Sequence, residues 1–150
     1  MKNYKVLVLT DHSGHSIQNS IYALLTEMNN HAQCGHIDVA SRALPQNNAF
    51  FNEMDVESLH GARVNSDFSF TEDGLYFTER LRQLSLNDYD IIFMRLPRPI
   101  TDEWLLWLEA HKGKATIVNN PKGIIKTSSK EYLLSIPEVC PTIRKINTLD

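Results

Sequence analysis

The chain has 150 residues, which gives room for one domain rather than two. Hydrophobic residues make up 42% and charged residues 22%, an ordinary globular composition that argues against a disordered chain. The 15 basic residues do not outnumber the 18 acidic ones, and no apolar stretch is long enough to span a bilayer, so we expect neither a nucleic-acid-binding protein nor a membrane protein. The N-terminal residues lack a signal-peptide pattern and two cysteines are too few for a disulfide framework, so we expect a soluble, cytoplasmic protein.

The first forty residues predict a strand, a helix and a second strand. The apolar run 5–10 is typical of a strand that is buried on both faces of a parallel sheet. Apolar residues at spacings of three and four from Ile17 to Met28 predict a helix, with Ser16 as its N-cap. Residues 36–40 predict the second strand, and such units pack with a right-handed crossover.

The middle of the chain is less regular. Hydrophobic periodicity fades between residues 41 and 65. Beyond it, alternating apolar residues in segments 68–70 and 75–77 lie on either side of Asp73-Gly74, a dipeptide that favours tight turns. We therefore expect a small β-hairpin here, as an excursion at the edge of the main sheet.

Strands and helices alternate again after residue 90. Residues 91–94 and 115–118 predict two strands, and Thr101 is expected to cap a helix between them. That helix has a buried stripe of Trp104, Leu105, Trp107 and Leu108. Ser128 or Ser129 should begin a further short helix. The whole pattern predicts an α/β fold with an open, mainly parallel, Rossmann-like sheet and helices on both faces.

Three polar segments each follow a predicted strand. They are Asp11 to Gly14, Arg95 to Arg98, and Asn119 to Pro121. Ligands of open parallel sheets bind beyond the carboxyl ends of the strands, so the three segments should meet at one rim. The first segment could present hydroxyls and backbone amides to an anion, but a polar turn with a capping serine is the favoured interpretation.

Arg95 and two histidines are candidate functional residues of this rim. Arg95 could bind a carboxylate or phosphate with two parallel hydrogen bonds, or form a surface ion pair with Asp102 or Glu103. His12 and His15 lie three residues apart, but no cysteine or carboxylate pair completes a zinc pattern, so solvent-facing loop histidines are favoured. The residues alone therefore predict an α/β domain with an anion-binding rim.

The order of segments from Leu86 to Thr142 resembles the N-terminal domain of bacterial glutathione synthetases, the domain that precedes their ATP-grasp region. Residues 88–95 are similar to the family's strand ending in Met-Arg, and residues 115–121 to its strand ending in Val-Asn-Asn-Pro. Pro141 and Thr142 stand where the family continues into the ATP-grasp region.

This family joins a carboxylate to an amine, with ATP and magnesium activating the carboxylate as an acyl phosphate. The resemblance implies a small amino-acid or peptide substrate, and it implies no catalytic residue or metal ligand in this chain. The implied substrate-binding residues are Asp11, Ser20, Arg95, Asn119 and Asn120. By the same resemblance, Lys130 would contact an ATP phosphate.

An ATP-grasp region would need about another domain's worth of residues beyond Asp150. We therefore expect residues 1–150 to form a single pre-ATP-grasp-like domain that is inactive alone. ATP and Mg²⁺ are expected for a longer parent protein, and no cofactor for this chain alone. The expected partner is a C-terminal ATP-grasp region, in the same polypeptide or lost, and self-association stays open. The alternatives are a stand-alone flavodoxin-like or anion- or nucleotide-binding module, and a protein-interaction domain.

Overall fold

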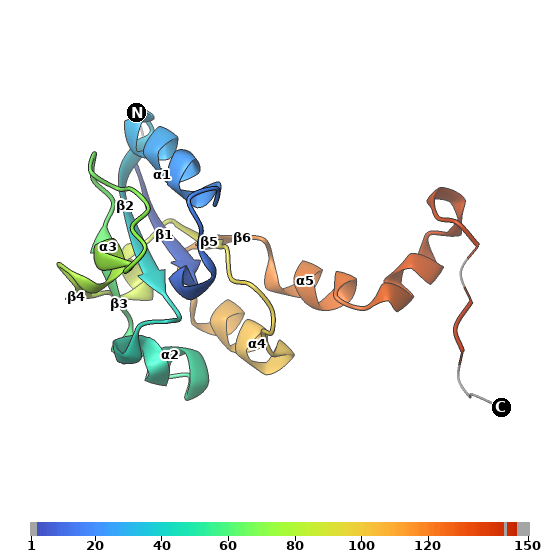
Figure 1. The fold of residues 1–150 in the computed structure, drawn as a ribbon. Coiled ribbons are helices and arrows are strands. Elements are labelled where there is room, and N and C mark those ends of the chain that lie inside the picture. The colour runs from blue at the N-terminus through green and yellow to red at the C-terminus, as the bar shows by residue number, and fades with distance from the viewer. Residues whose placement is uncertain (1–2, 143, 147–150) are drawn as a thin grey trace.

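A computed structural model of the protein describes residues 3–142 and 144–146. Its strands form one open sheet (Figure 1). In chain order the strands are β1 (Tyr4–Thr10), β2 (Cys34–Ser41), β3 (His60–Arg63), β4 (Arg82–Gln83), β5 (Ile91–Met94) and β6 (Thr116–Val118). The helices are α1 (Ile21–Asn30), α2 (Asn48–Asn52), α3 (Leu75–Thr78), α4 (Asp102–His111) and α5 (Pro121–Thr127).

The sheet is mixed, with the order β4-β3-β2-β1-β5-β6. Strands β2, β1, β5 and β6 run parallel to one another, as the sequence predicts. Strand β3 is antiparallel to β2, and β4 is antiparallel to β3. The structure is therefore an α/β fold in which a parallel core of four strands continues into a short antiparallel edge.

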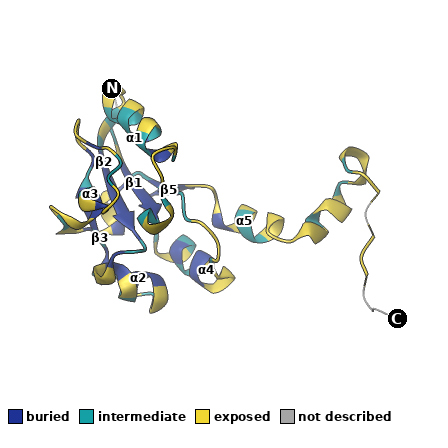
Figure 2. Cartoon of the chain, in the orientation of Figure 1, coloured by how far each residue is buried: buried dark blue, intermediate teal, exposed yellow. Residues whose placement is uncertain are grey.

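Helices cover both faces of this sheet, also as predicted. Alternate side chains of a strand point to opposite faces. Val6 and Val8 of β1 pack with residues of α1 and α3, whereas Leu7 and Leu9 pack with residues of α2 and α4. All four side chains are buried, and Figure 2 shows β1 as a buried central strand. This central position explains its continuous run of branched apolar residues.

The predicted β-hairpin between residues 68 and 77 is wrong. Gly74 has a φ of +64°, but it precedes helix α3 instead of closing a hairpin. The side chains of Thr71 and Asp73 both accept a hydrogen bond from the Leu75 backbone N–H, which begins the helix. The segment thus packs Phe68 and Phe77 against one sheet face as a compact loop and helix.

The antiparallel edge comes from segments where no strand was expected. Strand β3 lies in the stretch with fading periodicity, and both residues of β4 are exposed. A Cβ atom at Gly61 would lie 2.6 Å from the carbonyl oxygen of Val39, so a glycine is needed for β3 to pair this closely with β2. Hydrophobic patterning cannot reveal a strand whose position depends on the close approach of its backbone to a neighbouring strand.

Of the two helices whose N-caps were predicted, one begins at a different place and one begins as predicted. Helix α1 begins at Ile21 and not after Ser16, because the side chain of Asn19 accepts a hydrogen bond from the Ile21 N–H, at 3.0 Å. Ile17, expected on the buried face, is 79% exposed. Helix α4 begins as predicted, since the Thr101 hydroxyl accepts from the Trp104 N–H.

The C-terminal part of the chain differs most from a packed domain. Helix α5 was not predicted, and the helix expected near residue 129 is a 3-10 helix at Lys130–Ser135. None of the described residues after Pro121 is buried. Residues 128–142, which we call the C-terminal arm, extend away from the sheet (Figure 1). Among the described residues, no helix is long and apolar enough to cross a membrane.

Candidate functional site

The carboxyl ends of three parallel strands border one pocket with a volume of about 360 Å³, which we call the carboxyl-edge pocket. Asp11 follows β1, Arg95 follows β5, and Asn119 follows β6, so the structure brings these three predicted residues together. The pocket is lined by Thr10, Asp11, Gly14, His15, Asn19, Met94, Arg95, Leu96, Pro97 and Asn119. Neighbouring parallel strands end at the same edge of a sheet, which is why segments far apart in the sequence meet here.

Asp11 supplies a fixed negative charge to this pocket. One carboxylate oxygen accepts hydrogen bonds from the backbone N–H and hydroxyl of Ser13, and the other accepts from Nε of Arg42 at 2.9 Å. Arg42 also donates to the carbonyl oxygen of Pro99, at 2.8 Å. Burial would raise the pKa of Asp11, but the bonds from Ser13 and Arg42 outweigh it and hold that pKa below its usual value. Asp11 is therefore a carboxylate at neutral pH.

Arg95 supplies the positive charge. Its Nη2 donates to the hydroxyl of Ser20 at 3.0 Å, and its guanidinium carbon lies 5.9 Å from the centre of the Phe93 ring. No carboxylate among the described residues is within ion-pair distance, so the pair with Asp102 or Glu103 is not formed. A guanidinium has five N–H donors, and most of those on Arg95 stay available for an anion.

The two predicted asparagines, Asn119 and Asn120, make different contacts. Asn119 has a φ of +63°, and its side-chain amide donates to the carbonyl oxygen of Met94 at 2.6 Å, which ties the end of β6 to the end of β5. Asn120 caps α5 by accepting from the Gly123 N–H, at 3.2 Å. Only Asn119 lines the carboxyl-edge pocket, whereas both asparagines line a neighbouring pocket.

Ser20 and Lys130 are not part of the pocket lining. Ser20 precedes α1 and reaches the pocket through its hydrogen bond with Arg95. Lys130 is exposed on the C-terminal arm, which Figure 1 shows extending away from the carboxyl ends of the strands. The structure therefore does not bring Lys130 together with the other predicted residues.

The loop histidines are half-buried and not solvent-facing, which corrects the sequence-based interpretation. His15 bonds the Thr10 hydroxyl through Nε2 at 3.0 Å and the Tyr22 hydroxyl through Nδ1 at 2.9 Å. His12 bonds the Ser41 hydroxyl through Nδ1 at 2.6 Å. Burial lowers the pKa of both imidazoles and raises the pKa of Tyr22 to about 12. Within the described ranges, no group of three or more His, Cys, Asp or Glu side chains is arranged to hold a metal ion.

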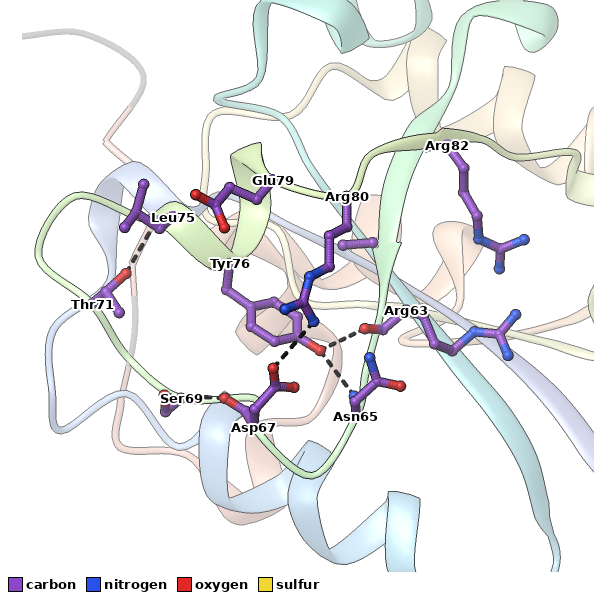
Figure 3. A pocket seen from close by; sticks show the side chains of 11 residues that line it. Arg63, Asn65, Asp67, Ser69, Thr71, Leu75, Tyr76, Glu79, Arg80 and Arg82 are labelled. Carbon is purple, nitrogen blue, oxygen red and sulfur yellow. Dashed lines mark hydrogen bonds and ion pairs between the residues drawn. The ribbon is translucent and has the colours of Figure 1, made fainter.

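A second cavity, of about 200 Å³, lies between β3 and α3. Figure 3 shows the Arg80 side chain pointing toward Asp67, while the guanidinium groups of Arg63 and Arg82 point away from Tyr76. Arg80 pairs with Asp67 at 3.2 Å, and the Tyr76 hydroxyl donates to the Arg63 carbonyl oxygen. Arg80 and the Tyr76 hydroxyl are thus bonded to other residues of the cavity lining.

The other two arginines, Arg63 and Arg82, bind a buried carboxylate at the antiparallel edge of the sheet. The Asp38 side chain has no exposed surface and accepts from Arg63 Nε at 2.9 Å, from Arg82 Nη2 at 2.5 Å and from the Tyr89 hydroxyl at 2.9 Å. Burial would raise the pKa of Asp38, and these three hydrogen bonds lower it below the usual value. The cluster around Asp38 therefore stabilises the edge of the sheet, and it was not visible in the sequence.

Comparisons with known proteins do not identify a relative. No model of a known protein family matches the chain, and no curated protein matches it. The resemblance to glutathione synthetases therefore stays a prediction from the order of short segments.

Proposed function

We propose that this chain binds a small amino acid or peptide in the carboxyl-edge pocket, as the substrate-side domain of an ATP-dependent carboxylate–amine ligase similar to glutathione synthetases. The observation that carries the proposal is the Arg95 guanidinium, which lines the pocket without a carboxylate partner among the described residues. Arginine binds carboxylates through paired N–H donors. The Asp11 carboxylate in the same pocket complements the ammonium group of an amino acid.

The sheet supports this proposal. Strands β2, β1, β5 and β6 form a parallel core with helices on both faces, which is the layout expected of a Rossmann-like domain. In the proposed ligase, ATP would phosphorylate the carboxylate of the substrate. This chain would hold and orient that carboxylate through Arg95, beside the ordered Asp11 loop. The described residues present no acidic cluster for magnesium, so no step through the metal is assigned to them.

Isothermal titration calorimetry with a panel of amino acids and dipeptides tests the binding step. Wild-type protein should bind at least one of them, and Arg95→Ala should weaken that binding at least tenfold, or about 1.4 kcal/mol, because a charge-assisted pair is lost. Arg80→Ala is the matched control, since Arg80 pairs with Asp67 away from this pocket. Absence of any binding, or equal binding by Arg95→Ala, would contradict the proposal.

The ligase step needs a separate test. A polypeptide that contains this chain together with an ATP-grasp region should release phosphate from ATP only when an acid and an amine are both present. Phosphate release that does not depend on both the acid and the amine would exclude a ligase activity. A yellow protein with bound FMN would favour the flavodoxin-like alternative instead.

A protein-interaction domain is the second candidate, because the C-terminal arm exposes large apolar side chains. Leu133, Leu134 and Val139 are 38%, 40% and 73% exposed. If these residues mediate self-association, sedimentation of the chain should show a dimer that Leu133→Ser with Leu134→Ser dissociates. A monomer at every concentration would exclude self-association through the arm.

A further inference from the structure

A larger pocket, of about 480 Å³, adjoins the carboxyl-edge pocket, and we call it the side pocket. It lies between the loop after β5 and helix α5, and it is lined by Met94, Leu96, Arg98, Ile100, Asn119, Asn120, Gly123, Ile124 and Thr127. Met94, Leu96 and Asn119 line both pockets. Because these residues border both, the two pockets are adjacent, as a ligand that spans them would require.

The side pocket has an apolar interior. Met94 belongs to the buried core, and Leu96, Ile100 and Ile124 pack against that core while they line the pocket. Arg98, its charged lining residue, is exposed. Apolar surface that stays accessible beside a charged pocket favours a ligand with an apolar group.

The uncharged polar side chains of the side pocket are each hydrogen-bonded within the chain. Asn120 accepts from the Gly123 N–H, and the Thr127 hydroxyl donates to the Gly123 carbonyl oxygen at 2.8 Å. The Asn119 amide donates to Met94. Apart from the exposed Arg98, the side pocket therefore presents mainly apolar side chains to a ligand.

Glycines keep both pockets open. A Cβ atom added at Gly123 in the side pocket, or at Gly14 in the carboxyl-edge pocket, would meet nothing within 4 Å. Neither glycine has a positive φ. A larger side chain can therefore be placed at either position without a clash at its Cβ and without straining the backbone.

We infer that the substrate carries an aliphatic group of several carbons, which occupies the side pocket while its carboxylate binds Arg95. This inference rests on the proposed function, and it specifies the substrate class. A third pocket of about 350 Å³, lined by Arg42, Phe51 and Trp104 among others, shares only Leu96 with the carboxyl-edge pocket. The side pocket is therefore the more direct continuation of the ligand site.

A series of straight-chain α-amino acids tests the inference by NMR titration of the ¹⁵N-labelled chain. Glycine, alanine, norvaline and norleucine share the carboxylate and ammonium groups and differ only in apolar length. Each additional carbon that is buried should tighten binding about fourfold, the factor that corresponds to about 0.8 kcal/mol per methylene. Glycine and norleucine binding equally well would overturn the inference while the proposed function stands.

Two variants, each designed to block one pocket, distinguish the contributions of the two pockets to binding. Gly123→Leu should abolish the dependence on chain length and leave glycine binding unchanged, whereas Gly14→Leu should weaken every ligand of the series. Length dependence that survives in a folded Gly123→Leu variant would overturn the inference. If that variant does not fold, the wild-type series decides alone. Failure of all amino acids and dipeptides to bind would remove the proposed function and the inference together.

Discussion

The two edges of this molecule use charged side chains in different ways. At the antiparallel edge, Arg63 and Arg82 share the buried carboxylate of Asp38. At the carboxyl edge of the parallel strands, Asp11 is also paired, but the partners of the Arg95 guanidinium among the described residues are a neutral hydroxyl and a ring face. At the antiparallel edge, both arginines are paired with a carboxylate of the chain. At the carboxyl edge, the Arg95 guanidinium stays available for a ligand.

This difference separates charges that stabilise the fold from charges that can bind a ligand. A buried carboxylate needs hydrogen-bonding partners, because its desolvation is otherwise unfavourable. A half-exposed guanidinium without a carboxylate partner has no such structural role. Mutations at the antiparallel edge should therefore change stability, and mutations at the carboxyl edge should change binding.

The largest expected effect is that of Asp38→Ala. The substitution leaves Arg63, Arg82 and the buried Tyr89 hydroxyl without their acceptor. We expect a loss of about 3 kcal/mol in the free energy of unfolding, measured by urea denaturation. Amino-acid binding by the folded fraction should not change, and a binding defect without a stability defect would reverse the assignment of the two edges.

Arg95→Ala should have the opposite profile. The weakening of amino-acid binding proposed above should come with a change of less than about 0.5 kcal/mol in unfolding free energy, because Arg95 makes only one side-chain hydrogen bond, to exposed Ser20. Calorimetry and urea denaturation on the same sample check both values. A large loss of stability would show that Arg95 is a structural residue.

The stability of the fold should also depend on pH in two separate steps. The pKa values of His12 and His15 are lowered in the folded chain, so their contribution is complete above the unfolded pKa of about 6.5 and is lost as the pH falls toward the folded values. The pKa of Asp38 is lowered from 3.8, so its contribution is lost only as the pH falls below about that value.

Urea denaturation between pH 8 and pH 3 measures both steps. His15→Gln should reduce the loss of unfolding free energy between pH 7 and pH 5, and it should leave the further loss below about pH 4 unchanged. Asp38→Asn should reduce only this further loss. If the free energy of unfolding declines near pH 6 to the same extent in a His12→Gln and His15→Gln double variant, that result would contradict the burial of these imidazoles.

The smallest effect is expected for Arg80→Ala. Arg80 is 71% exposed and its partner Asp67 is 54% exposed, so their ion pair should contribute less than about 0.5 kcal/mol. Thermal unfolding of the variant should match that of wild type at moderate salt. A marked destabilisation would mean that the cavity beside α3 depends on this pair.

Hydrophobic patterning in the sequence predicts the parallel core but not the antiparallel edge. The run in β1 and the cap at Thr101 correspond to local physical requirements, namely burial on two faces and an acceptor for unpaired N–H groups. Strand β3 depends on Gly61 approaching Val39, a contact between distant segments. The apparent hairpin around Gly74 became a helix start for a similar reason, because burial of Phe77 on the sheet decided its conformation.

The candidate site was predictable in part. Topology alone places Asp11, Arg95 and Asn119 at one edge, since each follows a parallel strand. The Arg42 partner of Asp11 and the bond between His15 and Tyr22 depend on side-chain packing that spacing does not encode. The side pocket was missed because its helix, α5, was not predicted from the sequence.

The most direct test of the account is to follow the arginine Nε–H signals of the ¹⁵N-labelled chain while norvaline is added. We expect a saturable shift of the Arg95 signal, with the Arg63 and Arg82 signals unchanged because both groups are occupied by Asp38. An unmoved Arg95 signal, or a shift of Arg63 and Arg82 in its place, would contradict the claim that the carboxyl edge is the binding edge.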